Sequence, residues 1–336
     1  MKTTMTTLTV LIAASALIVG LSCPAVAAVS GQCSNCHTMH DSQGDATMAT
    51  GGPHASLLLA DCLGCHTTAG ADPLDANGYP FVSSSGDSFT DDNCLAGGFF
   101  PNTIGTGDNA DDHHGVSALQ TNDPAGYDGS FYTGGANGLG CAGSNGCHGN
   151  ETDVSDMAAI SGEHHTSSGA YRMLYVDGDP VEGSGAADYE ELIINTPATS
   201  PVTSGAGQNV NIYCAGTATA SYVTISALCA KCHGDFHGAA NTLSGSDWIR
   251  HPTENAISTS WAIGALAYSP DGADYKNNPV GYDNATIDLD EKRVVCMSCH
   301  RAHGTENADL LRWDYSTQSA GSALEYGCLG CHDAQR

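Results

Sequence analysis

Basic residues are scarce in this chain. Its 336 residues include 10 lysines and arginines against 37 aspartates and glutamates, a formal net charge of −27. Nucleic acid and anionic membranes are bound through lysine and arginine, so the acidic excess excludes nucleic acid as a partner and argues against membrane docking. Solvation is the simplest role for so many carboxylates. Calcium binding at residues 108–112 is the alternative, and calcium is therefore a second candidate cofactor.

Long apolar runs are missing beyond the N-terminus. There, Lys2, the apolar stretch from Leu8 to Leu21 and the small-x-small site Ala25-Val26-Ala27 are typical of a secretory signal peptide over residues 1–27. A lipidated Cys23 is the alternative. No later run approaches the roughly 20 apolar residues that a membrane span needs. We therefore expect residues 28–336 to form a single domain that is secreted through the periplasm and is extracellular or attached to the cell surface.

Signals for regular secondary structure are sparse as well. The chain holds 41 glycines, and few segments keep an apolar helical period. The best helix candidates are 53–65, where Pro53 suits a first helical position, and 187–195. We expect a mostly irregular, coil- and turn-rich fold with a few short helices and minimal strand. A charged fraction of only 14% argues against disorder, so something other than side chains has to supply the apolar core.

Cysteine is abundant, and the sequence Cys-x-x-Cys-His occurs five times. The copies are Cys33-Cys36-His37, Cys62-Cys65-His66, Cys229-Cys232-His233, Cys296-Cys299-His300 and Cys328-Cys331-His332. This is the attachment motif of c-type haem, in which two thiols form thioethers and the histidine ligates the iron. Zinc sites do not place histidine directly after the second cysteine. The motifs indicate a multihaem cytochrome c. A linear row of its haem rings would form the missing apolar core.

A sixth haem is expected at Cys141, Cys147 and His148, where five residues instead of two separate the thiols. A glycine- and serine-rich insertion can loop outward while both sulfurs still reach one haem. The alternative is a short disulfide between Cys141 and Cys147. Two further cysteines, Cys94 and Cys214, remain in the mature chain, and we expect them to form a disulfide or to stay as buried free thiols.

Nine histidines lie outside the motifs and are candidates for the second axial position of the six irons. They are His40, His54, His113, His114, His164, His165, His237, His251 and His303. If each adjacent pair supplies one ligand, seven positions serve six irons. Met39, Met48 and Met297 are competing ligands, and a methionine ligand would raise the reduction potential. Six irons with histidine on both faces have no vacant position for a substrate, so we expect an electron carrier and not an enzyme.

Most of the few basic residues lie close to a motif or to a candidate ligand. They are Lys231, Arg250, Lys292, Arg293, Arg301 and Arg336. We expect them to pair with haem propionates through charge-assisted hydrogen bonds. Exposed, unpaired cations are the alternative.

The residues around the motifs resemble the OmcS-type hexahaem cytochromes, which polymerise into extracellular electron-conducting filaments. The stretches that carry the resemblance are Cys33 to His40, Cys229 to His237, Arg250-His251-Pro252, Cys296 to His303 and the last motif near the C-terminus. Their order and rough spacing match along the mature chain, while the connecting segments look unrelated.

The resemblance implies a row of bis-histidine haems in alternating parallel-stacked and T-shaped pairs. It also implies that His40 ligates the haem at His300 of the next subunit, which would make the chain its own partner in a head-to-tail polymer. Outer-membrane cytochromes and extracellular electron acceptors would be the other partners. The chain departs from the pattern at its third motif, where we expect His164 or His165 to stand in as the ligand. A monomeric periplasmic or surface shuttle is the alternative function, and a multihaem reductase is the third hypothesis.

Overall fold

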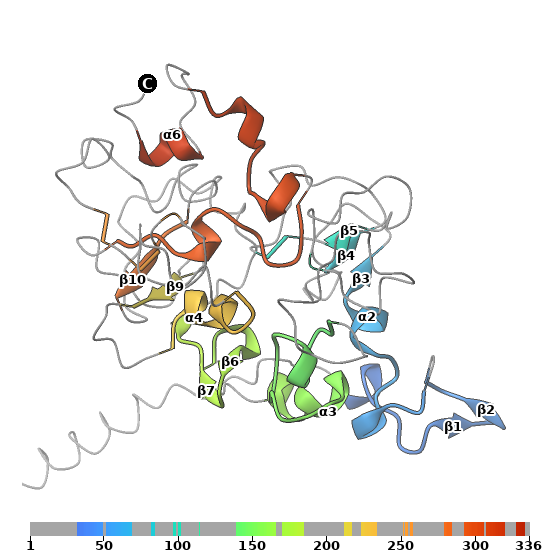
Figure 1. The fold of residues 1–336 in the computed structure, drawn as a ribbon. Helices are drawn as coiled ribbons and strands as arrows, with labels where there is room; N and C mark the ends of the chain where they lie inside the picture. The colour runs from blue at the N-terminus through green and yellow to red at the C-terminus, as the bar shows by residue number, and fades with distance from the viewer. Residues whose placement is uncertain are drawn as a thin grey trace, which may run out of the picture.

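The computed structural model in Figure 1 shows a chain with little regular structure. It describes residues 32–49, 52–68, 82–84, 97–98, 100–101, 114, 139–165, 170–184, 212–216, 223–233, 251, 253–254, 256–257, 279–283, 292–305, 307–319 and 327–332. The expected signal peptide, the helix candidate 187–195, the calcium candidate 108–112 and Cys94 lie outside these residues.

The helices that the structure describes are short. The α-helices are α2 (Cys62–Cys65), α3 (Asp156–Ala159), α4 (Ile225–Ala230) and α6 (Cys328–Cys331). The 3-10 helices are η1 (Cys33–Asn35), η2 (Ala55–Leu57), η4 (Gly143–Asn145), η5 (Glu163–His165), η6 (Tyr171–Met173), η10 (Cys296–Ser298), η11 (Ala308–Leu310) and η12 (Tyr315–Thr317). Even α4 has only six residues. The expectation of an irregular fold with a few short helices is confirmed.

The helix expected over 53–65 forms only at its C-terminal end, as α2. The backbone at Ser56 and Leu57 of η2 is left-handed, with φ of 57° and 54°, and this conformation excludes a right-handed helix there. The second helix starts at Cys62 because the Asp61 carboxylate accepts a hydrogen bond from the Gly64 amide, 2.7 Å away, as an N-cap. The apolar run Leu57-Leu58-Leu59 is thus a turn and an extended segment.

Strands of two to four residues join parts of the chain that are far apart in sequence. They are β1 (Ser42–Gln43), β2 (Ala46–Thr47), β3 (Thr67–Thr68), β4 (Ser83–Ser84), β5 (Phe100–Pro101), β6 (Tyr175–Val176), β7 (Asp179–Pro180), β8 (Gly183–Ser184), β9 (Ile212–Ala215) and β10 (Gly281–Asp283). β1–β2 and β6–β7 are antiparallel hairpins. β3, β4 and β5 pair in parallel, and β9 lies between β8 and β10.

An apolar cluster lies where α4, β9 and η10 meet. Tyr213 of β9 is 1% exposed and packs edge-on against Tyr171. The other buried members are Leu174, Val181, Ala215, Ile225, Val295 and Met297. Since Met297 belongs to this cluster, its thioether fills the core. Cys214 of β9 lies buried beside it.

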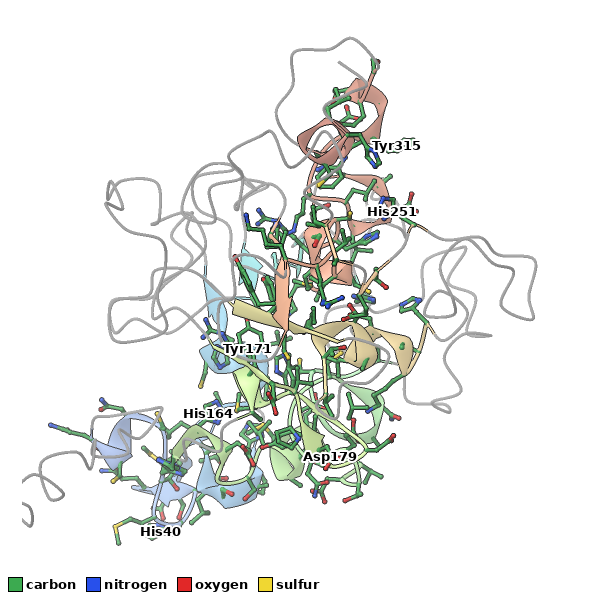
Figure 2. The ribbon with its side chains drawn as sticks, turned by 90° about the vertical axis from the view of Figure 1, so that its left-hand side faces the viewer. His40, His164, Tyr171, Asp179, His251 and Tyr315 are labelled. Atoms are coloured by element: carbon green, nitrogen blue, oxygen red, sulfur yellow. The ribbon has the colours of Figure 1, made fainter. Side chains whose placement is uncertain are left out.

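The described elements follow one another along the molecule roughly in sequence order. Figures 1 and 2 place β1 and β2 at one end, α3 and α4 in the middle and the C-terminal helices at the other end. His40 and Tyr315 mark the two ends in Figure 2. None of the helices in the described part of the chain has the length and apolar character to cross a membrane.

Candidate haem-attachment sites

We number the six motifs along the chain, so that the motif of Cys141, Cys147 and His148 is motif 3. In all six, the amide of the motif histidine donates a hydrogen bond to the carbonyl oxygen of the first cysteine. The N···O distances are 2.8 Å at His37, 2.8 Å at His66, 3.1 Å at His148, 2.9 Å at His233, 3.1 Å at His300 and 2.8 Å at His332. This bond closes each motif into one tight loop and brings the histidine next to the first thiol.

Motif 3 keeps this bond because its insertion folds outward. The inserted residues form η4, and the Cys147 amide also donates to the Cys141 carbonyl, at 3.2 Å. Two glycines permit the loop: Gly143 has φ of +76°, and a Cβ at Gly146 would lie 2.4 Å from the Ala142 amide nitrogen. Both Cys141 and Cys147 are free thiols. His148 thus makes the same backbone hydrogen bond to the first cysteine as the histidines of the regular motifs.

The local helix type alternates from motif to motif. Motifs 1, 3 and 5 carry the 3-10 helices η1, η4 and η10, whereas motifs 2, 4 and 6 lie on or at the end of α2, α4 and α6. Caps support two of the α-helices: Asp61 caps α2, and Thr224 Oγ1 accepts from the Ala227 amide of α4 at 3.0 Å. The chain is therefore built from pairs of motifs, which we call units: unit 1 holds motifs 1 and 2, unit 2 motifs 3 and 4, and unit 3 motifs 5 and 6.

Five motif histidines each face a histidine from outside the motifs. The ring centroids are 5.9 Å apart for His37 and His165, 6.3 Å for His66 and His164, 6.1 Å for His233 and His114, 6.3 Å for His148 and His303, and 6.1 Å for His332 and His251. Every pair combines one motif ring with one other ring. If the histidine rings were paired without regard to the motifs, we would not expect all five pairs to combine a motif ring with another ring.

The separation fits an iron between the two rings. A bond from imidazole to a first-row metal is about 2 Å long, so two rings on opposite faces of one metal have centroids about 6 Å apart. Ligation also needs the neutral imidazole. Burial, followed by the neighbouring His148, lowers the pKa of His303 to about 4. Burial is also the first cause of the lowered pKa values of His148, His164, His233 and His300.

The pairing corrects two expectations. Adjacent His164 and His165 were expected to supply one ligand, but the structure places each opposite a different motif histidine. Both lie in η5, where successive side chains point about 120° apart, so neighbouring rings can face different partners. His164 or His165 was also expected at motif 3. Instead, it is His303 from unit 3 that lies opposite His148.

His300 is the motif histidine without such a partner among the described residues. Its Nδ1 donates to the Asp309 carbonyl oxygen at 2.8 Å. His40 is exposed, with Nδ1 3.2 Å from Ser42 Oγ, and its neighbour Met39 is 90% exposed. His54 lies beside η2, and the remaining candidates His113 and His237 lie outside the described residues.

Neighbouring motifs meet through their thiols, and each junction includes two cysteines that occupy the same position in their motifs. First cysteines lie close together between motifs 2 and 3, where the Sγ atoms of Cys62 and Cys141 are within 4.8 Å of each other, and interact between motifs 4 and 5, where Cys296 raises the pKa of Cys229. Second cysteines lie within electrostatic reach of each other between motifs 1 and 2 (Cys36 and Cys65), 3 and 4 (Cys147 and Cys232), and 5 and 6 (Cys299 and Cys331). The motifs are therefore arranged in the order of their numbers, with two alternating kinds of junction.

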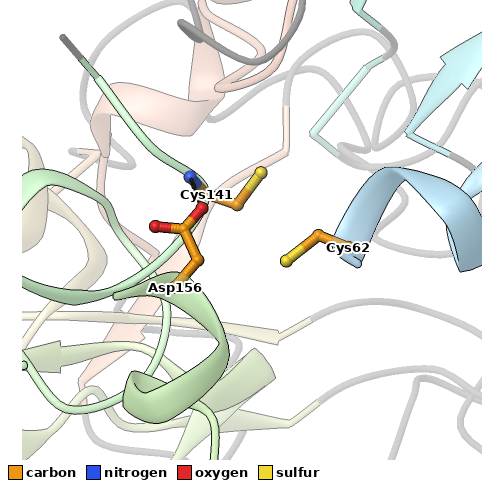
Figure 3. A group of neighbouring side chains, drawn as sticks. All are labelled: Cys62, Cys141 and Asp156. Atoms are coloured by element: carbon orange, nitrogen blue, oxygen red, sulfur yellow. Dashed lines mark hydrogen bonds between the residues drawn. The ribbon is translucent and has the colours of Figure 1, made fainter. Parts of the chain in front are cut away.

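Figure 3 shows one of these junctions, in which the side chains of Cys62 and Cys141 point toward each other beside Asp156. Their ligand atoms and a carboxylate oxygen of Asp156 lie within 4.8 Å of one another. Asp156 also accepts a hydrogen bond from the Cys141 amide, at 2.9 Å. The geometry alone would suit a metal ion, but both thiols belong to attachment motifs, so we interpret the cluster as the junction of motifs 2 and 3.

Two of the basic residues expected to pair with haem propionates contact acceptors within the chain. Lys231 forms an ion pair with Glu151, and Arg293 donates to the Glu254 carbonyl oxygen at 3.0 Å. Arg301 is buried as expected of a paired cation, 5% exposed. Arg312 is also buried and donates to the Met297 carbonyl oxygen. Sequence reasoning missed Arg312 because it lies far from any motif in the chain. Arg250 and Arg336 lie outside the described residues.

Sequence reasoning also missed a turn that occurs once in each unit. It comprises the 3-10 helices η2, η6 and η11, and each of the three turns is followed by a leucine that pairs with the motif histidine: His37 with Leu58, His148 with Leu174 and His300 with Leu311. The signal is present in the sequence as Ser56-Leu57-Leu58, Arg172-Met173-Leu174 and Asp309-Leu310-Leu311, each with an aspartate three residues after the last leucine.

Comparisons with known proteins agree with the motif-based interpretation. A family described as having a doubled CXXCH motif matches residues 290–336, which hold unit 3. No curated protein matches the chain. Among solved structures, the chain is similar to the outer membrane cytochrome S filament from Geobacter sulfurreducens, with 20% identity, a TM-score of 0.41 and 88% of each chain covered. The doubled CXXCH match supports the interpretation of unit 3 as a pair of haem-attachment motifs.

Proposed function

We propose that this chain is a hexahaem electron carrier that polymerises head to tail into an extracellular conducting filament. The observation that carries the proposal is the set of five histidine pairs, each with one motif ring and one other ring about 6 Å apart. The thiols of each motif would hold the haem covalently, and the paired imidazoles would ligate its iron from both faces. When bound, haem supplies reversible one-electron chemistry, and electrons would hop between adjacent rings.

Motif 3 is included among the attachment sites because it reproduces the regular motif in three respects. His148 makes the same backbone bond to the first cysteine, faces His303 as the other motif histidines face theirs, and lies between motifs 2 and 4 through its two thiols. A disulfide between Cys141 and Cys147 would require neither of the last two features. Six attachment sites per chain follow.

The alternating thiol junctions support a continuous row. Each of motifs 2 to 5 presents its first cysteine to one neighbour and its second cysteine to the other, so a ring attached there would have neighbours on two different edges. Two alternating junctions are what alternating stacked and T-shaped haem pairs would need. The row would begin at motif 1 near His40 and end at motif 6, at opposite ends of the described molecule (Figure 2).

Polymerisation is supported by the one motif histidine that has no partner ring in its own chain among the described residues. Five pairs account for the other five motif histidines, and His300 is left. His40 is exposed at the far end of the molecule, and its Nδ1 lies beside Ser42 Oγ, so its Nε2 is available to a metal. His40 of one subunit would therefore complete the coordination at His300 of the next.

The protein would reach the outside of the cell through its N-terminal segment. We propose that residues 1–27 are a signal peptide removed on export and that residues 28–336 form the hexahaem domain. The oxidising compartment beyond the cytoplasm would allow Cys94 and Cys214 to pair. The partners would be other copies of the chain, outer-membrane cytochromes that deliver electrons, and extracellular acceptors.

Two measurements on the purified protein test the proposal. A pyridine haemochrome assay should return six haems per chain, and five would remove motif 3 from the set of attachment sites. Negative-stain electron microscopy should show filaments. Six haems in a protein that stays monomeric would favour the shuttle, while a high-spin ferric signal from the intact assembly would reveal an open iron and favour a reductase.

A further inference from the structure

Three motif histidines are held by the same kind of backbone group. The Nδ1–H group donates to a carbonyl oxygen at 2.8 Å from His37 to Ser56, at 2.9 Å from His148 to Arg172 and at 2.8 Å from His300 to Asp309. The acceptor is 19, 24 and 9 residues away in sequence. Chain separations this different show that the contact is set by the fold of each unit and not by local chain stiffness.

The acceptor lies in an unusual conformation each time. It is the first of two successive residues with positive φ, at 57° and 54° for Ser56 and Leu57 and at 52° and 59° for Arg172 and Met173. In unit 3 the angles are 59° and 57° for Asp309 and Leu310. Two such residues in a row define a type I′ turn, which glycine, asparagine and aspartate favour. Leucine and methionine adopt it at a cost.

The turn also forms a backbone hydrogen bond with the residue that follows the motif histidine. The residue after the motif histidine donates its amide to the carbonyl of the second left-handed residue: Thr38 to Leu57 at 2.8 Å, Gly149 to Met173 at 2.7 Å and Arg301 to Leu310 at 2.9 Å. The carbonyl that accepts from Nδ1 and the carbonyl that accepts from the backbone are consecutive. The left-handed conformation is what turns both toward the motif.

The side chain of the acceptor residue varies while its backbone does not. Serine, arginine and aspartate occupy the position, and all three are exposed. Only the carbonyl is common to them. A strained conformation that recurs three times with different exposed side chains is explained if the carbonyl itself has a role at the haem.

We propose that this turn is a haem-positioning element, used once in each two-motif unit, whose carbonyl oxygens at Ser56, Arg172 and Asp309 fix the ring orientation and raise the basicity of the imidazole at motifs 1, 3 and 5. A hydrogen bond from the second nitrogen of a ligating histidine has both effects on metal centres. The proposal rests on haem attachment as proposed above and is independent of polymerisation.

Ser56 gives the cleanest test, since its side chain is exposed. Ser56→Gly keeps a residue that adopts positive φ readily. Ser56→Val introduces a β-branched residue that resists it, and Ser56→Ala is intermediate. Each full-length variant is purified with its haems, and the haem count, the low-temperature EPR spectrum of the ferric protein and the potentiometric titration are recorded.

The glycine variant should match the unsubstituted protein in all three measurements. In the valine variant the haem count should stay at six, while one low-spin EPR signal shifts and one midpoint potential rises, because the ligand loses basicity. If the Ser56→Val protein loses a haem, the Ser56→Ala protein provides the test. A smaller shift of the EPR signal and midpoint potential in the same direction supports the role of the turn, and unchanged spectra overturn it. Identical spectra and potentials for glycine and valine also overturn it. The haem count of the unsubstituted protein tests the proposed function separately.

Discussion

One exposed histidine, His40, is the residue through which we propose that one subunit binds the next. It lies at the base of the β1–β2 hairpin, and its backbone amide donates to Thr38 Oγ1 at 3.1 Å. The Thr38 hydroxyl also accepts from the Asp41 amide, at 2.6 Å. The segment that carries the ring is therefore ordered before any partner binds, which reduces the entropy lost on assembly.

Replacing His40 by alanine should abolish filaments while leaving six haems attached, because every thiol and all five intrachain pairs remain. Negative-stain electron microscopy and analytical ultracentrifugation measure assembly, and pyridine haemochrome measures haem. Val154→Ala is a suitable control, since Val154 is also exposed, at 84%, but lies in unit 2. Filaments of normal length from the His40 variant would refute the intersubunit ligand.

The orientation of paired rings differs between haems, and it should be visible spectroscopically. The ring planes of His66 and His164 are 22° apart, whereas those of His332 and His251 are 84° apart. Near-parallel and near-perpendicular axial imidazoles split the iron orbitals differently, so the ferric protein should give two classes of low-spin EPR signal.

His251→Ala should remove the signal of the near-perpendicular class and add a high-spin signal. His164→Ala is the matched control, because it also removes one non-motif ring but should instead remove a signal of the near-parallel class. If both variants lost the same class of signal, or if neither produced high-spin iron, the assignment of these rings as axial ligands would fail.

At the scale of elements, the η4 loop decides whether motif 3 can hold a haem. Gly146→Ala should reduce the haem count from six to five, because the new methyl group would lie 2.4 to 2.6 Å from backbone atoms of Ala142 and would push Cys147 away from Cys141. Ser144→Ala in the same loop is the control, since that side chain is exposed. Pyridine haemochrome together with the visible spectrum of each variant measures the result, and six haems in Gly146→Ala would contradict it.

The sequence was informative about elements where chemistry fixes the residues. The motifs, the proposed sixth attachment site at Cys141 and the set of candidate histidines could all be named without a structure. The turns at Ser56, Arg172 and Asp309 could not, because they depend on backbone carbonyls and any side chain can supply a carbonyl. The pairing of His164 and His165 with two different motif histidines also needed the structure, since the direction of each ring depends on η5.

At the scale of the whole molecule, the repulsion between negatively charged subunits opposes the proposed bond from His40 to the iron of the next subunit. A chain with a net charge of −27 repels its own copies, and an intersubunit bond to iron would have to overcome that repulsion. The repulsion between exposed charges falls off over a Debye length, which is about 30 Å at 0.01 M salt and about 8 Å at 0.15 M. Assembly should therefore strengthen as salt is added.

Raising the sodium chloride concentration across this range should increase the fraction of protein that sediments as polymer. Sucrose at matched osmolality is the control, because it does not screen charge. A polymer fraction that falls with salt would show that attraction between oppositely charged surfaces holds the subunits together. In that case the metal bond would not be the main link.

The irregular character of the fold could be predicted from composition, but its organisation into three units could not. The chain has no fixed repeat period, since the connections between motifs differ widely in length. Units 1, 2 and 3 are related through the helix type of each motif, the turn after the odd motifs and the thiol junctions. These features can be recognised only in the structure, which brings Cys62 close to Cys141 and Cys229 close to Cys296.

The central claim is a single row of six irons, each between two imidazoles. A cryo-electron microscopy map of the assembled, oxidised protein tests it most directly. We expect haem density between each of the five intrachain histidine pairs and a sixth haem between His300 and His40 of the next subunit, with adjacent rings in contact throughout. A map with no haem at His148, with a haem bound on one face only, or with haems too far apart to touch would contradict the account.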